Sequence, residues 1–271
     1  YDEGKSHQWD ALAQPSGFGF NWSSNYTVYL ETLEQFDFTD GTSGMLDRSI
    51  YDDATEIDPN WFFEMRDPRM KASIFYPGSS FKGGTVHFHR SMSGSLSGWP
   101  RTGPSKHIGS MATGLLIRKR TNPETPDATR SSTDYIIFRL GEIILNYVEA
   151  AFYLNDPNGD MLANLNNLRD RAGMPSLSIG QVSQDKIRQE RRCELAFEEH
   201  TFWDLRRWRI AVEELDNKQR HRLHYRYNAN TKKYTIEMAP GDLGGVRLHP
   251  PRNYYYALGL SRLADNPKLI E

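Results

Sequence analysis

Hydrophobic residues recur at helical spacing between residues 134 and 216, and this spacing fades on either side. The first run places apolar side chains on two adjacent faces of one helix: Ile136, Leu140, Ile143, Tyr147 and Ala151 on one face, and Ile137, Ile144, Val148 and Phe152 on the other. A helix that is apolar on two faces packs against neighbours on both sides, as in a bundle or a helical repeat. The pattern therefore predicts a helix near residues 136–152 that is covered from both sides.

Three more helices are predicted to follow, so that this region forms two successive helical hairpins. The second helix begins with Asp160 as its N-cap and ends before Gly173 and Pro175, which suit a C-terminal stop. The third runs from about residue 183 to residue 198. The fourth has capping-box spacing between Thr201 and Asp204. It is expected to bury four side chains: Phe202, Leu205, Trp208 and Val212.

The rest of the chain carries the signals of loops and short strands. Residues 1–130 are rich in Gly, Ser, Pro and Asp and contain only brief apolar runs. Beyond residue 216, residues 223–227 and 234–238 are expected to pair as a hairpin with its turn at 228–232. The chain thus divides into a loop-rich, aromatic-rich region, residues 1–130, and a helical region with a closing hairpin and loops, residues 131–271. The fold class is mainly α, in a loop-rich α+β arrangement.

The composition of the chain argues against several classes of function. The chain has 271 residues, enough for a sizeable core, and a formal net charge of −2, which gives no basic footprint for nucleic acid. It contains no run of eighteen or so apolar residues that would span a bilayer. The only cysteine, Cys193, can form no intramolecular disulfide and is expected to be a buried, inert thiol. No cofactor is expected.

Three ordered motifs lie in the helical region, with supporting blocks on either side. They span residues 139–151 (RLGEIILNYVEAA), 165–175 (LNNLRDRAGMP) and 187–208 (IRQERRCELAFEEHTFWDLRRW). Arg66-Asp67-Pro68-Arg69-Met70 lies upstream, and Leu248-His-Pro-Pro and Asn266-Pro267 lie downstream. In this order and spacing, the blocks closely resemble the SusD/RagB family over roughly residues 60–270. The chain departs from the family pattern at four positions: Gly141, Val148, Glu199 and Thr201.

The resemblance implies a fold of tetratricopeptide-like helical hairpins and a function in nutrient capture. Such proteins are lipid-anchored at the outer-membrane surface of Bacteroidetes-type bacteria. They cap a SusC-like TonB-dependent transporter and hand it oligosaccharides, or peptides in some branches. Family members carry more helical sequence on the N-terminal side, so the chain is expected to be the C-terminal portion of a longer protein. The lipid anchor, and part of the binding site, would then belong to the absent region.

A row of carboxylates raises glycoside hydrolysis as an alternative function. A hydrolase needs two carboxylates that face one sugar across a cleft. Glu190, Glu194 and Glu198 instead follow one another at intervals of four, along one face of one helix. Ion pairing with arginines of neighbouring helices is therefore expected, with four candidate partners: Arg169, Arg171, Arg206 and Arg207. No catalytic residue is predicted.

Two histidines could begin a metal site. His87 and His89 would share one face of a strand, but no third and fourth ligand follows nearby. No metal site is predicted.

Aromatic residues of the first hundred positions are the candidate ligand contacts. Sugars bind to flat aromatic faces, supported by amides and charged groups that reach the hydroxyls. The predicted ligand-binding residues are Trp9, Trp22, Tyr26, Trp61, Tyr76 and Trp99. A third possibility stays open beside binding and hydrolysis, namely a structural interaction module in which these aromatics form a core.

Overall fold

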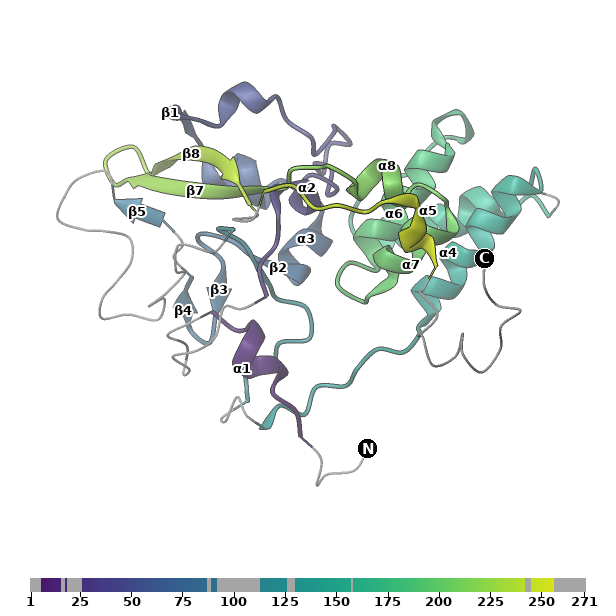
Figure 1. The fold of residues 1–271 in the computed structure, drawn as a ribbon, viewed down its shortest axis with the longest axis horizontal. Helices are drawn as coiled ribbons and strands as arrows, with labels where there is room; N and C mark the ends of the chain where they lie inside the picture. Colours follow the sequence, from purple (N-terminus) through teal and green to yellow (C-terminus); the bar gives the residue numbers. More distant parts are fainter. Residues whose placement is uncertain are drawn as a thin grey trace.

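The structure is a computed structural model, and its helices and strands lie at opposite ends of the molecule (Figure 1). A four-stranded sheet forms one end and helices α4 to α8 the other, with α2 and α3 between them. The structure describes residues 6–15, 18, 26–86, 89–91, 113–125, 130–156, 158–241 and 245–255. The α-helices are α1 (Trp9–Ala13), α2 (Leu30–Leu33), α3 (Pro68–Ser73), α4 (Leu140–Tyr153), α5 (Met161–Arg171), α6 (Gln184–Glu194), α7 (His200–Arg207) and α8 (Ala211–Leu215).

The sheet joins segments from both ends of the sequence. Its strands are ordered β1-β8-β7-β5, with β1 (Asp52–Ile57), β5 (His89–Ser91), β7 (His221–Asn228) and β8 (Lys233–Pro240). β8 is antiparallel to both neighbours, whereas β5 is parallel to β7. The predicted hairpin is therefore confirmed as β7–β8. It also crosses the predicted division at residue 130, because it supplies the middle strands of a sheet whose outer strands come from the first hundred residues.

Two small antiparallel pairs complete the strands. β2 (Ile74–Phe75) pairs with β6 (Leu116–Ile117), and β3 (Ser80–Phe81) pairs with β4 (Gly84–Thr85). Lys82 and Gly83 form the two-residue turn of the second pair, and both have positive φ, as primed hairpin turns require at their first position or at both. This turn carries Lys82 to the edge of the cavity described below.

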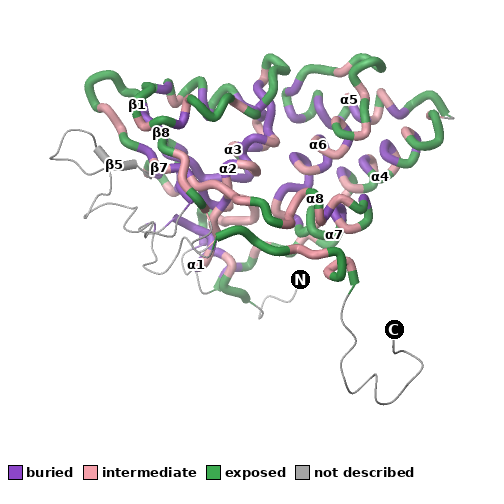
Figure 2. Tube along the Cα trace, turned by 45° about the horizontal axis from the view of Figure 1, so that its top comes forward, coloured by how far each residue is buried: buried purple, intermediate pink, exposed green. Residues whose placement is uncertain are grey.

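An aromatic core lies between the sheet and helices α2 and α3. Phe62, Phe63 and Phe75 are fully buried, and Tyr225 of β7 is 2% exposed among them. Figure 2 shows buried segments along α2, α3 and the inner side of β7 and β8. Burying each phenylalanine contributes about 1.5–3 kcal/mol, so this core is a principal source of stability.

The block Arg66-Asp67-Pro68-Arg69-Met70 ties this core to the helices. The Arg66 side chain is completely buried, and its guanidinium donates to the carbonyls of Phe62, Phe36 and Gly44 at 2.8–3.0 Å. Burial lowers the pKa of Arg66 to about 10. Asp67 caps α3 by accepting from the Arg69 amide at 2.9 Å, and Pro68 fills the first helical position.

The first predicted helical hairpin is confirmed as α4 and α5. Val148 and Ala151 of α4 pack against Met161 and Leu165 of α5 and against Ile187 of α6. Gly173 follows α5 with φ +75°, as a C-terminal stop requires, and Ser183 caps α6 by accepting from the Lys186 amide at 3.1 Å. Asp160 stands at the N-cap of α5 as expected, although its side chain makes no capping bond there.

Two expectations for the helical region are wrong. Only one face of α4 is covered among the described residues, since Leu140 and Ile143 on its other face are 72% and 50% exposed. The predicted fourth helix is broken into α7 and α8, because Arg209 between them has φ +61°. Phe202 is 43% exposed and Val212 is only partly buried, whereas Leu205 and Trp208 are buried as predicted.

The start of α7 also differs from the expected capping box. The N-cap is Glu199, with φ +66° and no capping bond from its side chain. This left-handed geometry favours glycine, so Glu199 is held in a conformation that its residue type does not favour.

Candidate functional site

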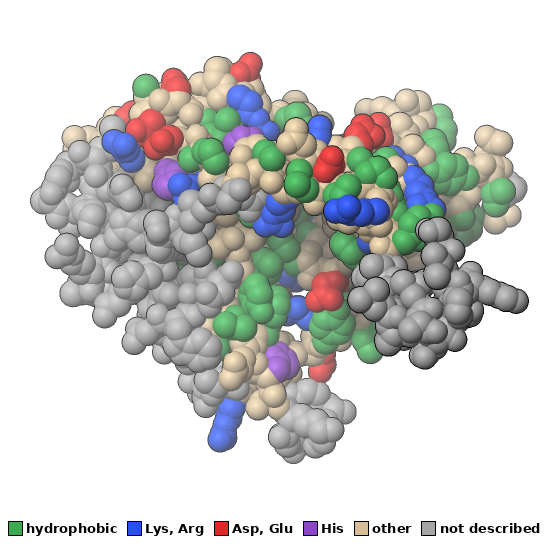
Figure 3. All heavy atoms as spheres, viewed as in Figure 1, with side chains coloured by type: hydrophobic (Ala, Val, Ile, Leu, Met, Phe, Trp, Pro, Cys, Tyr) green, Lys and Arg blue, Asp and Glu red, His purple; other side chains and the backbone are tan. Residues whose placement is uncertain are grey.

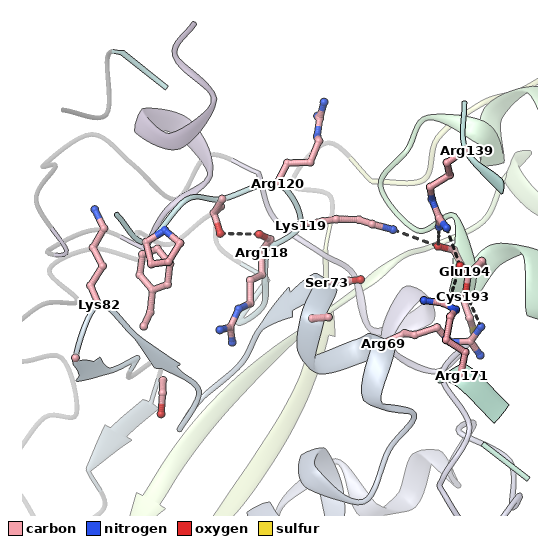
Figure 4. Close-up of a pocket in the computed structure, with 16 residues that line it drawn as sticks. Arg69, Ser73, Lys82, Arg118, Lys119, Arg120, Arg139, Arg171, Cys193 and Glu194 are labelled. Atoms are coloured by element: carbon pink, nitrogen blue, oxygen red, sulfur yellow. Dashed lines mark hydrogen bonds and ion pairs between the residues drawn. The ribbon is translucent and has the colours of Figure 1, made fainter. Parts of the chain in front are cut away.

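A cavity of about 550 Å³ opens between the sheet end and the helical end of the molecule (Figure 4). Its volume lies in the usual range for ligand sites. It is bounded by α3, the β3–β4 turn, residues 118–123, the start of α4, the end of α5 and α6. Basic side chains dominate its lining: Arg69, Lys82, Arg118, Lys119, Arg120, Arg139 and Arg171, with Glu194 as the lining carboxylate. Figure 3 shows a hollow between the two ends of the molecule, with acidic and basic side chains visible inside it.

One end of the cavity, which we call the paired end, is built on three carboxylates: Glu190 and Glu194 of α6, and Glu198, which lies just after this helix. Arg69 of α3 donates to Glu190 at 2.6 Å and to Glu194 at 3.0 Å. Arg139, which precedes α4, donates to Glu194 at 2.7 Å and to both oxygens of Glu198 at 2.8 and 2.9 Å. The carboxylates thus join α6 to α3 and α4.

Helix α5 and the residue-119 segment complete the paired end. Arg169 and Arg171 of α5 donate to Glu190 and Glu194 at 2.7 and 2.6 Å, and Lys119 pairs with Glu198. The three carboxylates are buried, with side-chain exposures of 1–2%. Five segments of the chain, namely α3, the residue-119 segment, the start of α4, α5 and α6, therefore meet at one buried ion network.

The ion network favours the ionised form of two carboxylates, Glu194 and Glu198. Burial raises the pKa of Glu194, but hydrogen bonds from Arg139 and Arg69 outweigh burial and hold this pKa below its ordinary value. The pKa of Glu198 is lowered in the same way, with Arg139 and Lys119 as donors. A carboxyl group with a lowered pKa is a poor general acid at neutral pH.

Gly141 makes room for this network. A Cβ atom at position 141 would lie 2.5 Å from an Nη atom of Arg139 and 2.9 Å from Glu194 Oε1. The departure from the family pattern at this position therefore lets the Arg139–Glu194 pair lie close against α4.

The other end of the cavity, which we call the open end, holds Lys82, Arg118 and Arg120. Figure 4 shows Lys119 pointing toward Glu194, whereas Arg118 points away from the paired end. Arg118 and Arg120 form no ion pair with a carboxylate of the described residues. Their guanidinium groups lie over aromatic rings instead: Arg118 over Phe75 at 5.3 Å, and Arg120 over Trp9 at 4.0 Å and Tyr135 at 5.0 Å.

The backbone around Arg120 is a tight turn. β6 pairs with β2, and the Arg118 amide then donates to the carbonyl of Ser73 at 2.8 Å. The Thr121 amide donates back to the Arg118 carbonyl at 3.0 Å, which closes a turn whose third residue is Arg120. Arg120 has φ +64°, in the left-handed region where glycine or asparagine is favoured.

The structure brings two of the six predicted ligand contacts together. Trp9 and Tyr26 stack with centroids 4.9 Å apart, and the Trp9 indole donates to the Lys119 carbonyl at 3.2 Å. Because Arg120 also lies over the Trp9 ring, this ring is largely covered by the protein itself. Trp9 is therefore better suited to positioning Arg120 than to stacking on a sugar.

The other predicted contacts lie apart from this pair. Trp61 stacks on Phe38 with centroids 5.4 Å apart, and it is 43% exposed. Tyr76 is 5% exposed, because its ring stacks on Phe63 inside the aromatic core and its hydroxyl donates to Glu64. Its ring faces are not available to a ligand, which corrects the expectation for this residue. Trp22 and Trp99 lie outside the described residues, as does His87, which was considered as a metal ligand.

The ion pairs of Glu190, Glu194 and Glu198 were predicted only in part. Arg169 and Arg171 are partners as expected. Arg206 instead donates to the carbonyls of Asn253 and Tyr254, and Arg207 pairs with Glu149 and Asp204. Arg69, Lys119 and Arg139 were not predicted as partners. Three consecutive basic residues, 118–120, were the available signal in the sequence for the open end.

Comparison with known proteins identifies the family to which this chain belongs. The SusD family model matches residues 2–270, so the chain belongs to the SusD family. SusD-like protein P2 of Formosa agariphila is 32% identical over 93 residues, which are 31% of this chain and 18% of that protein. The helical hairpins are accordingly those of a SusD-like protein.

Two solved structures show how much of the fold is shared. A SusD-like protein from Bacteroides fragilis superposes with a TM-score of 0.70 at 24% identity, covering 95% of this chain and 49% of that chain. A SusD-like carbohydrate binding protein from the same species also has a TM-score of 0.70, at 23% identity, covering 100% of this chain and 53% of that chain. The chain thus spans about half the length of the solved structures it matches.

No helix in the described ranges has both the length and the apolar character needed to cross a membrane.

Proposed function

We propose that this chain is part of a cell-surface protein that binds an oligosaccharide without cleaving it and delivers it to a SusC-like TonB-dependent outer-membrane transporter. The match to the SusD family over residues 2–270 carries this proposal. A cavity of ligand size and an exposed tryptophan, Trp61, support it from the geometry.

The arrangement of the carboxylates supports binding rather than hydrolysis. Glu190, Glu194 and Glu198 lie on or just after one helix, and each of them is held by at least two cationic side chains. A retaining or inverting hydrolase needs one protonated carboxyl group facing a second carboxylate across the sugar. The lowered pKa values of Glu194 and Glu198 oppose that role.

Trp61 is the residue through which we test binding. A ring that stacks on a sugar and excludes water contributes about 2 kcal/mol or more, so Trp61→Ala should weaken binding at least about tenfold. Affinity is measured by calorimetry against a panel of neutral and acidic oligosaccharides, and the same mixtures are assayed for new reducing ends. Trp203→Ala is the matched control, because Trp203 is 55% exposed on α7.

Three results would contradict the proposal. Turnover that disappears when a carboxylate pair is replaced would make the protein an enzyme. Unchanged affinity in Trp61→Ala, with reduced stability, would make Trp61 a structural residue. Failure of a TonB-dependent transporter to co-purify with the full-length protein from outer membranes would remove the delivery role.

A further inference from the structure

We infer that a second cavity, between α2, α7 and the segment that leads into β7, binds a small organic carboxylate whose remaining atoms are apolar. This cavity, which we call the α2–α7 cavity, has a volume of about 530 Å³, in the usual range for ligand sites. It shares no lining residue with the cavity described above. The inference therefore goes beyond the proposed function and does not depend on it.

Part of the lining of the α2–α7 cavity is an apolar wall. It is formed by Ala196 and Phe197 between α6 and α7, Phe202 and Leu205 of α7, and Leu215 of α8. Phe202 was predicted to be buried in a helix interface, but it lines this cavity and remains exposed. A wall of this kind favours a ligand with an apolar body, because contact with it removes apolar surface from water on both sides.

Another part of the lining is a basic rim. Lys218 and Arg247 are partners in an antiparallel bridge, so their side chains lie side by side. Arg220 lines the cavity as well, whereas Gln219 does not, as expected where alternate residues face the same side. In Figure 1, residues 245–255, in yellow, pass from the sheet toward α7 along this rim. Like charges that are paired in this way repel each other unless an anion lies between them.

Two cations of the rim are accessible to an anion. Lys218 is exposed, and its ammonium forms no hydrogen bond or ion pair with a described residue. Arg220 donates to the carbonyl of Glu214 at 2.6 Å, which is a neutral acceptor. The other nitrogens of Arg220 are not among the buried unpartnered atoms, so they can still donate to a ligand.

The carboxylates of the lining do not neutralise this rim. Glu31 accepts from the backbone amide of His221 at 3.1 Å and also contacts its ring. Glu214 pairs with Arg192 at 3.1 Å. Even with Arg247 left aside, three lining cations meet two lining carboxylates, and both carboxylates are engaged elsewhere. The excess of positive charge favours a ligand that carries negative charge.

The two parts of the lining together define the class of ligand. A guanidinium beside an ammonium is suited to a carboxylate, because both donate charge-assisted hydrogen bonds to its oxygens. Thr32, Gln35 and Thr201 supply few further hydroxyl or amide groups, which does not suit the many hydroxyls of a sugar. An apolar wall with a small number of charged donors instead fits an amphiphilic anion.

The test uses four ligands that share parts of one carbon skeleton. Phenylpropionate has both the ring and the charge, phenylpropanol lacks the charge, propionate lacks the ring, and N-acetylphenylalanine adds a peptide-like amide. Each is titrated while the methyl signals of Leu205 and Leu215 are followed by NMR, with Leu165 of the α4–α5 hairpin as the reference. We expect saturable shifts with phenylpropionate, at an affinity at least about tenfold above that for phenylpropanol or propionate. Comparison with N-acetylphenylalanine distinguishes a free small acid from the C-terminus of a peptide.

Variants separate the charge from the wall. The double variant Lys218→Gln/Arg220→Gln should weaken phenylpropionate binding at least about tenfold and leave phenylpropanol binding unchanged. Arg220→Lys keeps the positive charge and should retain most of the affinity. Phe202→Ala should weaken the binding of both ligands. Lys233→Gln is the control, because Lys233 is exposed on β8 and does not line this cavity. Melting temperatures show that each variant is folded.

Several results would overturn the inference. They are the absence of a saturable shift with phenylpropionate, equal affinity for phenylpropanol or for propionate, and wild-type affinity in the double variant. If the signals responded in this chain but not in the full-length protein, another part of that protein would cover the cavity and the inference would fall. The proposed function is tested separately through Trp61, which does not line this cavity, so Trp61→Ala should leave phenylpropionate binding unchanged.

Discussion

Both ends of the cavity are basic, but they use their basic side chains differently. At the paired end, arginines of three separate segments are held by the buried carboxylates of α6 and Glu198, so their charges connect helices to one another. At the open end, Arg118 and Arg120 lie over aromatic rings without a carboxylate partner among the described residues. The number of charges in a sequence therefore says little about their use. The presence of a partner decides whether a cation stabilises the fold or remains available to a ligand.

The sharpest test of this comparison removes one arginine from each end. Arg69→Ala should destabilise the protein by about 3–5 kcal/mol, because it leaves Asp67, Glu190 and Glu194 buried with fewer partners. Arg118→Ala should change the free energy of unfolding by less than about 0.5 kcal/mol. Urea unfolding of both variants measures the difference. Equal destabilisation by the two substitutions would show that the open end is also structural.

A second test concerns α7, where another buried carboxylate, Glu149, is held by side chains of a neighbouring helix. Trp208 is 9% exposed, and its indole donates to Glu149 at 2.7 Å while Arg207 pairs with the same carboxylate. Trp208→Ala should therefore cost about 3 kcal/mol, near the lower end of the range for buried aromatics. Phe202→Ala, on the exposed side of the same helix, should cost less than about 1 kcal/mol. If thermal unfolding showed that Phe202→Ala destabilises the protein more than Trp208→Ala does, the packing described for α7 would be wrong.

The smallest expected effect is the response to acid. The folded-state pKa values of Glu149, Glu194 and Glu198 are lowered, because hydrogen bonds from cationic neighbours outweigh the effect of burial. Groups of this kind contribute stability that is fully present above the unfolded pKa, about 4.5, and is lost as pH falls through the folded pKa. Burial raises the pKa of Glu34, which has the opposite sign and offsets part of this loss.

The melting temperature should therefore fall between about pH 5 and about pH 3. Glu198→Gln should flatten this fall, because glutamine does not titrate, whereas Glu56→Gln on the exposed face of β1 should not. A melting temperature that is independent of pH in this window would contradict the charge state assigned to the paired end.

The helices were predictable where the signals are local. The spacing of Val148, Ala151 and Leu165 and the turn signals at Gly173 and Ser183 identified α4, α5 and α6, because these patterns act within a few residues. The break between α7 and α8 was not predictable, since Arg209 adopts a left-handed conformation that its residue type does not favour. The exposed face of α4 was misjudged because helical periodicity identifies an apolar face but not what covers it.

The candidate site was less predictable than the helices. Tyr76 and Trp61 both lie in aromatic-rich segments before residue 100, yet the first is in the core and the second is exposed. Composition cannot separate these cases, because loop segments lack the periodicity that marks one face as buried. The open end depends on Trp9 and Arg120 meeting across more than a hundred residues, which is a consequence of the tertiary fold rather than of a local motif.

The order of strands in the sheet has a consequence for how the chain folds. β8 lies between β1 and β7, and the Thr235 hydroxyl donates to Asp53, 182 residues earlier. During synthesis, β1 is therefore complete long before its neighbouring strand, β8, has been made. The aromatic core that lies against the sheet cannot be covered until then. Contacts of such long sequence separation form slowly and leave apolar surface exposed in the meantime. We expect a shortened chain that ends before β7 to keep its helical hairpins but to aggregate through the open aromatic core.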